Sequence, residues 1–171
     1  MRRGPNPQLG FTVIEILLVI VIMGVFLTIA APSFVTFTSS QKVKTASFDV
    51  YAALLFARSE AIKRRQNVTI TPVGSDWKKG WTVHATIGGV DTTLRTQDSL
   101  SGVVFSGATS IVYRLDGRLS GSGGIVGVLI QPEIASSTIA NRCIRVDATG
   151  LPKSTSITDT TCLCNDATLC S

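Results

Sequence analysis

The sequence of 171 residues has an N-terminal stretch that is almost without charge. Between Phe11 and Ala31 the only charged residue is Glu15, and lysine, arginine, asparagine and glutamine are absent. About 20 apolar residues at ~1.5 Å each match a hydrocarbon core about 30 Å thick. The stretch from Gly10 to Pro32 is therefore predicted to cross a membrane as a helix. A carboxylate at that depth costs roughly 2.5–3.5 kcal/mol and normally has a partner, yet no cation lies near Glu15 along this helix.

The sequence patterns of common enzymes are also missing. It contains no GxSxG, P-loop, HExxH or dinucleotide-binding glycine pattern, and its acidic residues are too scattered to form a catalytic carboxylate pair. The single histidine, His84, lacks partners at metal-ligating spacing, so a structural or surface role is favoured. Trp77 and Trp81, with two lysines between them, are one arrangement that stacks bases, but a core position for Trp81 is favoured. We predict that the protein is not an enzyme and binds no metal or cofactor.

Cysteine is absent from the first 142 residues, and the four cysteines are Cys143, Cys162, Cys164 and Cys170. An even number in an oxidising compartment predicts two disulfides. Bonding Cys162 to Cys164 would need a strained turn, so we favour Cys143 paired with Cys162 or Cys164, and Cys170 closing a small terminal loop. A zinc site built from these thiolates is the alternative, but an oxidising compartment would favour disulfides.

The helix is predicted to continue well beyond the apolar stretch, because residues 34–70 contain no proline and residues 26–71 contain no glycine. One apolar stripe follows three-to-four spacing: Val43, Ala46, Val50, Leu54, Ala57 and Ala61. We divide the helix into an apolar half, residues 11–32, and an amphipathic half, residues 33–67, which ends near Gln66 or Asn67. Gly24 and Pro32 are the expected points of bending.

The apolar period changes to two after the helix, which predicts a β-rich domain over residues 68–171 with a cysteine-rich tail. Strands are expected near residues 68–72, 81–85, 92–96, 103–105, 111–115, 125–130 and 143–146, with a weak one at 154–161. Turns are expected at residues 88–89, 116–117 and 148–150. A long helix followed by many short strands predicts an α+β fold in which the helix packs on antiparallel sheets.

The N-terminal residues resemble the class III signal segment of type IV pilins and type II secretion pseudopilins. A basic leader of residues 1–10, MRRGPNPQLG, ends in Gly10 and is followed by Phe11. In this family the prepilin peptidase cuts between these two residues and methylates the new N-terminus. Glu15 then occupies the family's most characteristic position, the fifth of the mature chain, and Pro32 lies where many pilins carry a helix-bending proline. An ordinary signal anchor with an incidental glutamate is the alternative.

This resemblance implies a partner for Glu15, namely the α-amine of Phe11 on a neighbouring subunit. It also implies a single-pass inner-membrane protein whose C-terminal domain lies in the periplasm before assembly into a filament. The positive-inside rule agrees, because Arg2 and Arg3 are the only basic residues before Lys42. The partners implied are other pilin subunits, the prepilin peptidase and membrane lipid.

Three later segments resemble one branch of the family, the H-type (GspH) pseudopilins and the FimT/FimU minor pilins. They are residues 54–71 (LLFARSEAIKRRQNVTIT), 77–83 (WKKGWTV) and 113–121 (YRLDGRLSG). The resemblance implies a type IV pilin-like fold and a low-abundance subunit that helps to initiate or cap a filament. We favour a type IV pilus minor pilin, because a disulfide-rich tail suits a filament outside the cell. The H-type minor pseudopilin of a type II secretion system is the alternative.

A third hypothesis is DNA binding for natural transformation, with Arg142, Arg145 and Lys153 as candidate contacts. FimT-type pilins that bind DNA carry a Gly-Arg-x-Arg motif near the C-terminus. The corresponding residues here are 150–153, GLPK, so leucine and lysine replace the two arginines. Lysine contacts phosphate but loses the bidentate fork, and Arg142 and Arg145 are expected on opposite faces of a strand. This departure disfavours DNA binding.

Overall fold

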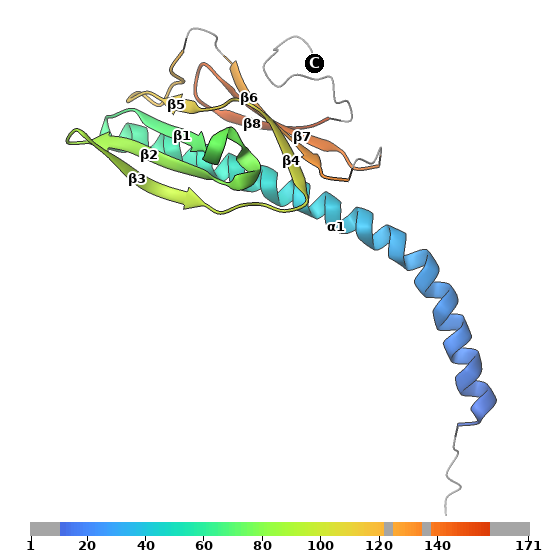
Figure 1. The fold of residues 1–171 in the computed structure, drawn as a ribbon. Coiled ribbons are helices and arrows are strands. Elements are labelled where there is room, and N and C mark those ends of the chain that lie inside the picture. Colours follow the sequence, from blue (N-terminus) through green and yellow to red (C-terminus); the bar gives the residue numbers. More distant parts are fainter. Residues whose placement is uncertain (1–10, 122–124, 135–137, 158–171) are drawn as a thin grey trace, which may run out of the picture. The chain divides into compact units, whose positions relative to one another are not determined.

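A computed structural model describes residues 11–121, 125–134 and 138–157, with only the backbone of residues 29–32. One long helix, α1 (Val13–Arg64), comes first and eight short strands follow within this part of the chain (Figure 1). The chain divides into two compact units, Met1–Val35 and Thr36–Ser171. The first unit contributes the apolar start of α1, and the second contains the rest of α1 together with the strands.

The strands form two antiparallel sheets of four strands each. The first has the order β3-β2-β1-β5, with β1 (Val68–Pro72), β2 (Trp81–Ile87), β3 (Val90–Gln97) and β5 (Ile111–Tyr113). The second has the order β4-β6-β7-β8, with β4 (Val103–Gly107), β6 (Ile125–Pro132), β7 (Asn141–Asp147) and β8 (Pro152–Ile157). Two single-turn 3₁₀ helices, η1 (Val73–Ser75) and η2 (Trp77–Lys79), connect β1 to β2. The α+β fold with a helix and antiparallel sheets is as predicted.

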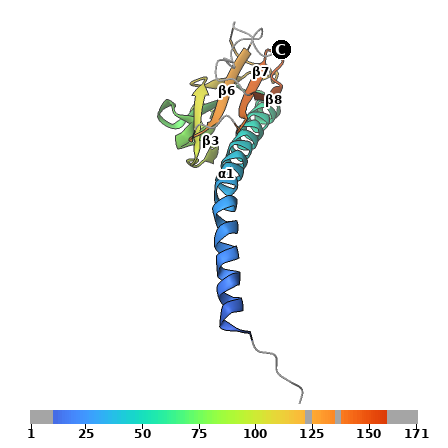
Figure 2. The same ribbon diagram turned by 90° about the vertical axis from the view of Figure 1, so that its right-hand side faces the viewer.

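The core lies between the second half of α1 and the two sheets (Figure 2). Every residue of the predicted helical stripe is at most 1% exposed, which confirms that stripe. Trp81 and Tyr113 are the largest fully buried side chains, and they come from β2 and β5. Trp77 is also buried, its ring centroid lies 5.6 Å from that of Trp81, and its Nε1–H donates to the carbonyl oxygen of Ala108 at 2.7 Å. Both tryptophans are thus core residues and neither presents a face for stacking a base.

The helix ends at Arg64, slightly before the predicted end at Gln66 or Asn67. Arg65 takes a left-handed conformation, with φ of 53°. The N–H of Gln66 donates to the carbonyl oxygen of Ala61 at 3.2 Å, and that of Arg65 to the carbonyl oxygen of Ile62 at 3.4 Å. These two bonds form a Schellman motif. The prediction ran too far because the left-handed position is usually marked by glycine, and here it holds arginine.

Strands β2, β3, β4, β6 and β7 extend one or two residues beyond their predicted bounds, and β5 and β8 differ in other ways. Strand β5 stops at Tyr113 instead of residue 115, because the N–H of Arg114 donates to the carbonyl oxygen of Arg118 and closes the turn around Gly117. Leu115, which the prediction placed in the strand, is 54% exposed. Strand β8 begins at Pro152 and is described to Ile157, so residues 158–161 of the predicted weak strand lie outside the described residues.

Candidate assembly surfaces

Two of the predicted site residues lie at the start of α1: Glu15 is in its first turn, and Phe11 lies two residues before the helix begins. Thr12 caps the helix, because its Oγ1 accepts the N–H of Glu15 at 3.3 Å. Thr12 and Glu15 have the spacing of a capping box, and a carboxylate is favoured at the positive end of a helix. Phe11 is 80% exposed, and Gly10 lies outside the described residues. The first turn thus presents a carboxylate next to the predicted N-terminus of the mature chain.

The side chains of residues 11–28 are all exposed in the single chain, although nearly all are apolar. No single helix in the described residues passes a length and hydropathy test for a membrane span, but Val13–Thr28 and Ser33–Arg64 pass it together as a pair with a break between them. That break falls on residues 29–32, which include Pro32, whereas Gly24 lies within the first segment. The bending roles of Gly24 and Pro32 stay predictions. A helix that is apolar on every side needs lipid or other helices around it.

Arg58 connects the C-terminal part of α1 to two turns that are distant in the sequence. Its Nε–H donates to the carbonyl oxygen of Gly117 at 3.0 Å, and its second guanidinium nitrogen donates to the carbonyl oxygen of Thr149 at 3.4 Å. The two turns also touch each other, since a Cβ added to Gly150 would overlap the carbonyl oxygen of Gly117. We call this arrangement the Arg58 clasp. It joins the segment ARSEAIKR, which contains Arg58, to the segment YRLDGRLSG, which contains Gly117.

Charged side chains close to the clasp are held in defined positions. Glu60 is buried, and its carboxylate pairs with Arg64 Nε at 2.5 Å and with Lys63 Nζ at 3.7 Å. The hydrogen bond from Arg64 lowers the pKa of Glu60. Burial raises the pKa of Tyr113, whose hydroxyl has no hydrogen-bond partner among the described residues. Both ion pairs of Glu60 lie within the last turns of α1, so they stabilise the end of the helix itself.

The three basic residues predicted as DNA contacts do not form one patch. Arg145 on β7 pairs in register with Lys153 on β8, so these two lie on the same face of the second sheet. Arg142 lies on the opposite face, that of the buried Ile144, and points toward α1. Lys153 Nζ lies 3.7 Å from the carboxylate of Asp147. The structure thus leaves a cross-strand pair of cations, one of which already has a carboxylate partner.

Cys143 faces the same side of β7 as Arg145 and belongs to a small cluster with Leu129 and Ile157. Cys143 is disulfide-bonded. The other three cysteines, Cys162, Cys164 and Cys170, lie outside the described residues, so the pairing stays a prediction. Within the described part of the chain no three metal-ligating side chains gather at one place.

His84 has partners on two neighbouring strands. Its Nδ1 lies 2.7 Å from Asp91 Oδ1 on β3, and its Nε2 lies 3.1 Å from Thr71 Oγ1 on β1. Both ring nitrogens are thereby engaged across the first sheet. This position supports the predicted structural role.

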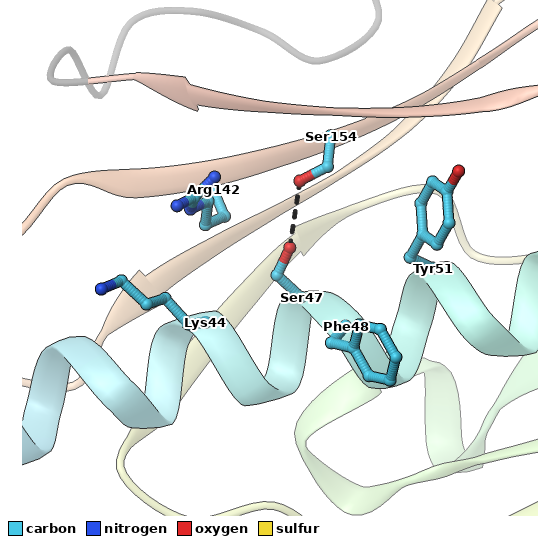
Figure 3. A pocket seen from close by; sticks show the side chains of 6 residues that line it. All are labelled: Lys44, Ser47, Phe48, Tyr51, Arg142 and Ser154. Carbon is cyan, nitrogen blue, oxygen red and sulfur yellow. Dashed lines mark hydrogen bonds between the residues drawn. The ribbon is translucent and has the colours of Figure 1, made fainter.

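A groove between α1 and the β7–β8 edge was not predicted from the sequence (Figure 3). It has a volume of about 370 Å³ and is lined by Lys44, Ser47, Phe48, Tyr51, Arg142 and Ser154. We call it the α1–β8 groove. The position of Phe48 outside the buried stripe was one signal for it. Phe48 recurs with Leu55 and Ile62 every seven residues, and the three are 70%, 39% and 48% exposed. This spacing marks a second apolar line along α1.

The sequence matches known family models in two regions. Residues 46–150, more than half of the chain, match the family described as "Type II transport protein GspH". Residues 5–31 match the "Prokaryotic N-terminal methylation motif". A search of curated proteins gave no match.

Solved structures with a similar fold come from two bacteria. The type IV minor pilin FimU of Pseudomonas aeruginosa PAO1 is 19% identical, with 75% of this chain and 98% of that chain covered and a TM-score of 0.61. The minor pseudopilin EpsH from the type 2 secretion system of Vibrio cholerae is 12% identical, with 67% and 97% covered and a TM-score of 0.54. These similarities confirm the predicted pilin-like fold. The family match over more than half of the chain shows that the chain belongs to the family described as Type II transport protein GspH.

Proposed function

We propose that this chain is a minor pilin that is built into a type IV pilus through its N-terminal helix and helps to initiate or cap the filament. The observation that carries this proposal is the first unit of α1. Its side chains over residues 11–28 are exposed on every side and nearly all apolar, and they lie within the match to the N-terminal methylation motif. A helix of this kind is stable in lipid or among similar helices, and assembly moves it from the first environment to the second.

Two steps prepare the subunit for assembly. The prepilin peptidase removes residues 1–10 by cleavage between Gly10 and Phe11 and methylates Phe11. The chain then stays in the inner membrane, with the domain after the apolar half of α1 in the periplasm. Glu15 pairs with the N-terminal amine of a neighbouring subunit, because an apolar environment strongly disfavours an unpaired carboxylate. This pairing sets the axial position of one helix against the next.

The test is whether the full-length chain is found in filaments that are sheared from the cells that express it. Wild-type chain is expected in the filament fraction, and Glu15→Val is expected to remain in the membrane fraction. Glu15→Asp is the matched control, since it keeps the charge and should retain part of the incorporation. Equal incorporation of Glu15→Val and wild type would refute the pairing. Replacement of Gly10 by leucine should leave an uncut, unmethylated precursor, which mass spectrometry of the intact protein detects.

The alternative assignment is the H-type minor pseudopilin of a type II secretion system. The family description and the fold of EpsH support it. Deletion of the gene separates the two functions. Loss of surface pili with normal protein secretion supports the pilus, and the reverse result supports the secretion system.

A further inference from the structure

The α1–β8 groove combines two cations with two aromatic side chains. Lys44 and Arg142 lie at one end of it and Tyr51 at the other, with the Phe48 ring on the α1 side (Figure 3). The hydroxyl groups of Ser47 and Ser154 lie 3.2 Å apart between them and join α1 to β8. Phenylalanine, tyrosine and arginine are residue types that protein interfaces favour.

Both cations of the groove lack a carboxylate partner among the described residues, and no carboxylate lines the groove. The carboxylates of Glu60, Glu133 and Asp147, in contrast, each pair with a lysine or arginine elsewhere on the domain. Two unpaired positive charges beside an apolar surface favour an occupant that carries a negative charge. Phe48 is 70% exposed, so burial of its aromatic ring by the same occupant would add to the binding free energy.

The edge of the second sheet runs beside this groove. β8 is the last strand in the order β4-β6-β7-β8, and no described strand pairs with its other side. Residues 153–156 of β8 are exposed. The outer edge of such a strand offers backbone N–H and C=O groups to an extended segment, and a strand added there places alternate side chains toward α1.

We propose that the α1–β8 groove holds an extended segment of a neighbouring pilin-type subunit, with a carboxylate of that segment between Lys44 and Arg142 and an apolar side chain on Phe48 and Tyr51. This inference rests on the proposed function, because it needs neighbouring subunits. A single-stranded nucleic acid fits less well. Only two cations line the groove, whereas nucleic acid binding uses a series of phosphate contacts along a positively charged track.

The test uses the full-length chain in cells that assemble filaments, with the photo-crosslinker p-benzoylphenylalanine in place of Phe48. Irradiation is expected to link the chain to another pilin-type subunit, at a peptide that mass spectrometry shows to contain aspartate or glutamate. The same crosslinker in place of Val90, which is 64% exposed at the far end of the β2–β3 hairpin, should not give this adduct. The double variant Lys44→Glu, Arg142→Glu should lower the adduct yield roughly tenfold or more. The double variant Arg145→Glu, Lys153→Glu, on the opposite face of the same strands, should leave it unchanged.

Three outcomes would overturn the proposal. They are an adduct within the chain's own residues 158–171, an adduct that nuclease removes, and no adduct in cells whose sheared filaments contain the chain. The filament fraction of the same cells separates this proposal from the proposed function. A chain present in filaments without the adduct refutes only the groove, whereas a chain absent from filaments refutes the proposed function as well.

Discussion

The Nε–H of Arg58 on α1 donates to the carbonyl oxygen of Gly117 at 3.0 Å, across 59 residues of sequence. The same guanidinium reaches Thr149, 91 residues away. Three parts of the domain therefore depend on one side chain: the helix, the turn after β5 and the turn after β7. The hydrogen-bonding capacity of arginine suits this role, since it presents several N–H donors in a fixed planar arrangement.

Substitution of Arg58 by alanine should lower the free energy of unfolding by about 1–3 kcal/mol, because two carbonyl groups lose a charged donor. Arg58→Lys should recover less than half of this loss, since lysine keeps the charge without the planar geometry. Urea unfolding of the full-length chain in nonionic detergent, followed by tryptophan fluorescence, measures both. Lys63→Ala is the control, because the Lys63 side chain is 75% exposed and should change stability by less than about 0.5 kcal/mol. An Arg58→Ala variant as stable as this control would show that the clasp contributes nothing.

Gly150 should be the most sensitive glycine of the clasp. Its φ is +79°, and an added Cβ would overlap the carbonyl oxygen of Gly117. Gly89 has a similar φ of +83° but no atom within 4 Å of an added Cβ. Gly89→Ala should therefore cost only the conformational strain of about 1–2 kcal/mol, and Gly150→Ala should cost about 1–3 kcal/mol more because the turns must separate. Equal unfolding midpoints in urea for the two variants would contradict the close contact.

The occurrence of the elements was predictable from the sequence, but their connections were not. Period-three-to-four burial from Val43 to Ala61 and period-two burial in β1 and β2 follow directly from residue order. The clasp depends on tertiary packing that brings the carbonyl groups of Gly117 and Thr149 close to Arg58. Local sequence patterns do not reveal this packing. The groove was missed for a related reason: Arg142 and Lys44 are almost 100 residues apart, and only the packing of β7 over α1 brings them to one site. The distribution of Arg142 and Arg145 over opposite faces was predicted, because strand alternation is a local property.

The stability of the domain should fall in acid partly through Glu60. Its carboxyl is buried, and the hydrogen bond from Arg64 lowers its pKa below the usual value of 4.5. A group whose folded-state pKa is depressed contributes stability that is complete above the unfolded pKa and disappears as the pH falls through the folded pKa. The contribution should thus be lost below about pH 4.5, and Glu60→Gln should flatten the pH dependence of the urea midpoint in that range. Asp98→Asn, which removes an exposed carboxylate, is the control. Parallel pH curves for wild type and Glu60→Gln would exclude this contribution.

DNA binding should be weak in this protein, because the candidate cations are divided between two faces of the second sheet. Arg145 and Lys153 lie together, but Lys153 Nζ is 3.7 Å from the carboxylate of Asp147. Fewer than two unpaired cations are therefore available there to bind phosphates. Each phosphate contact adds about one to the slope of log affinity against log salt, and a site of this size should give a slope below about 2. Titration of the full-length chain with double-stranded DNA at two salt concentrations measures the slope. The variant pair Arg145→Ala, Lys153→Ala tests the outer face, and Lys44→Ala, Arg142→Ala is the matched control on the face toward α1. Micromolar binding with a steep salt dependence, abolished only by the variant pair Arg145→Ala, Lys153→Ala, would identify a DNA-uptake pilin. A subunit that serves only to build the filament does not need a phosphate-binding site on that face.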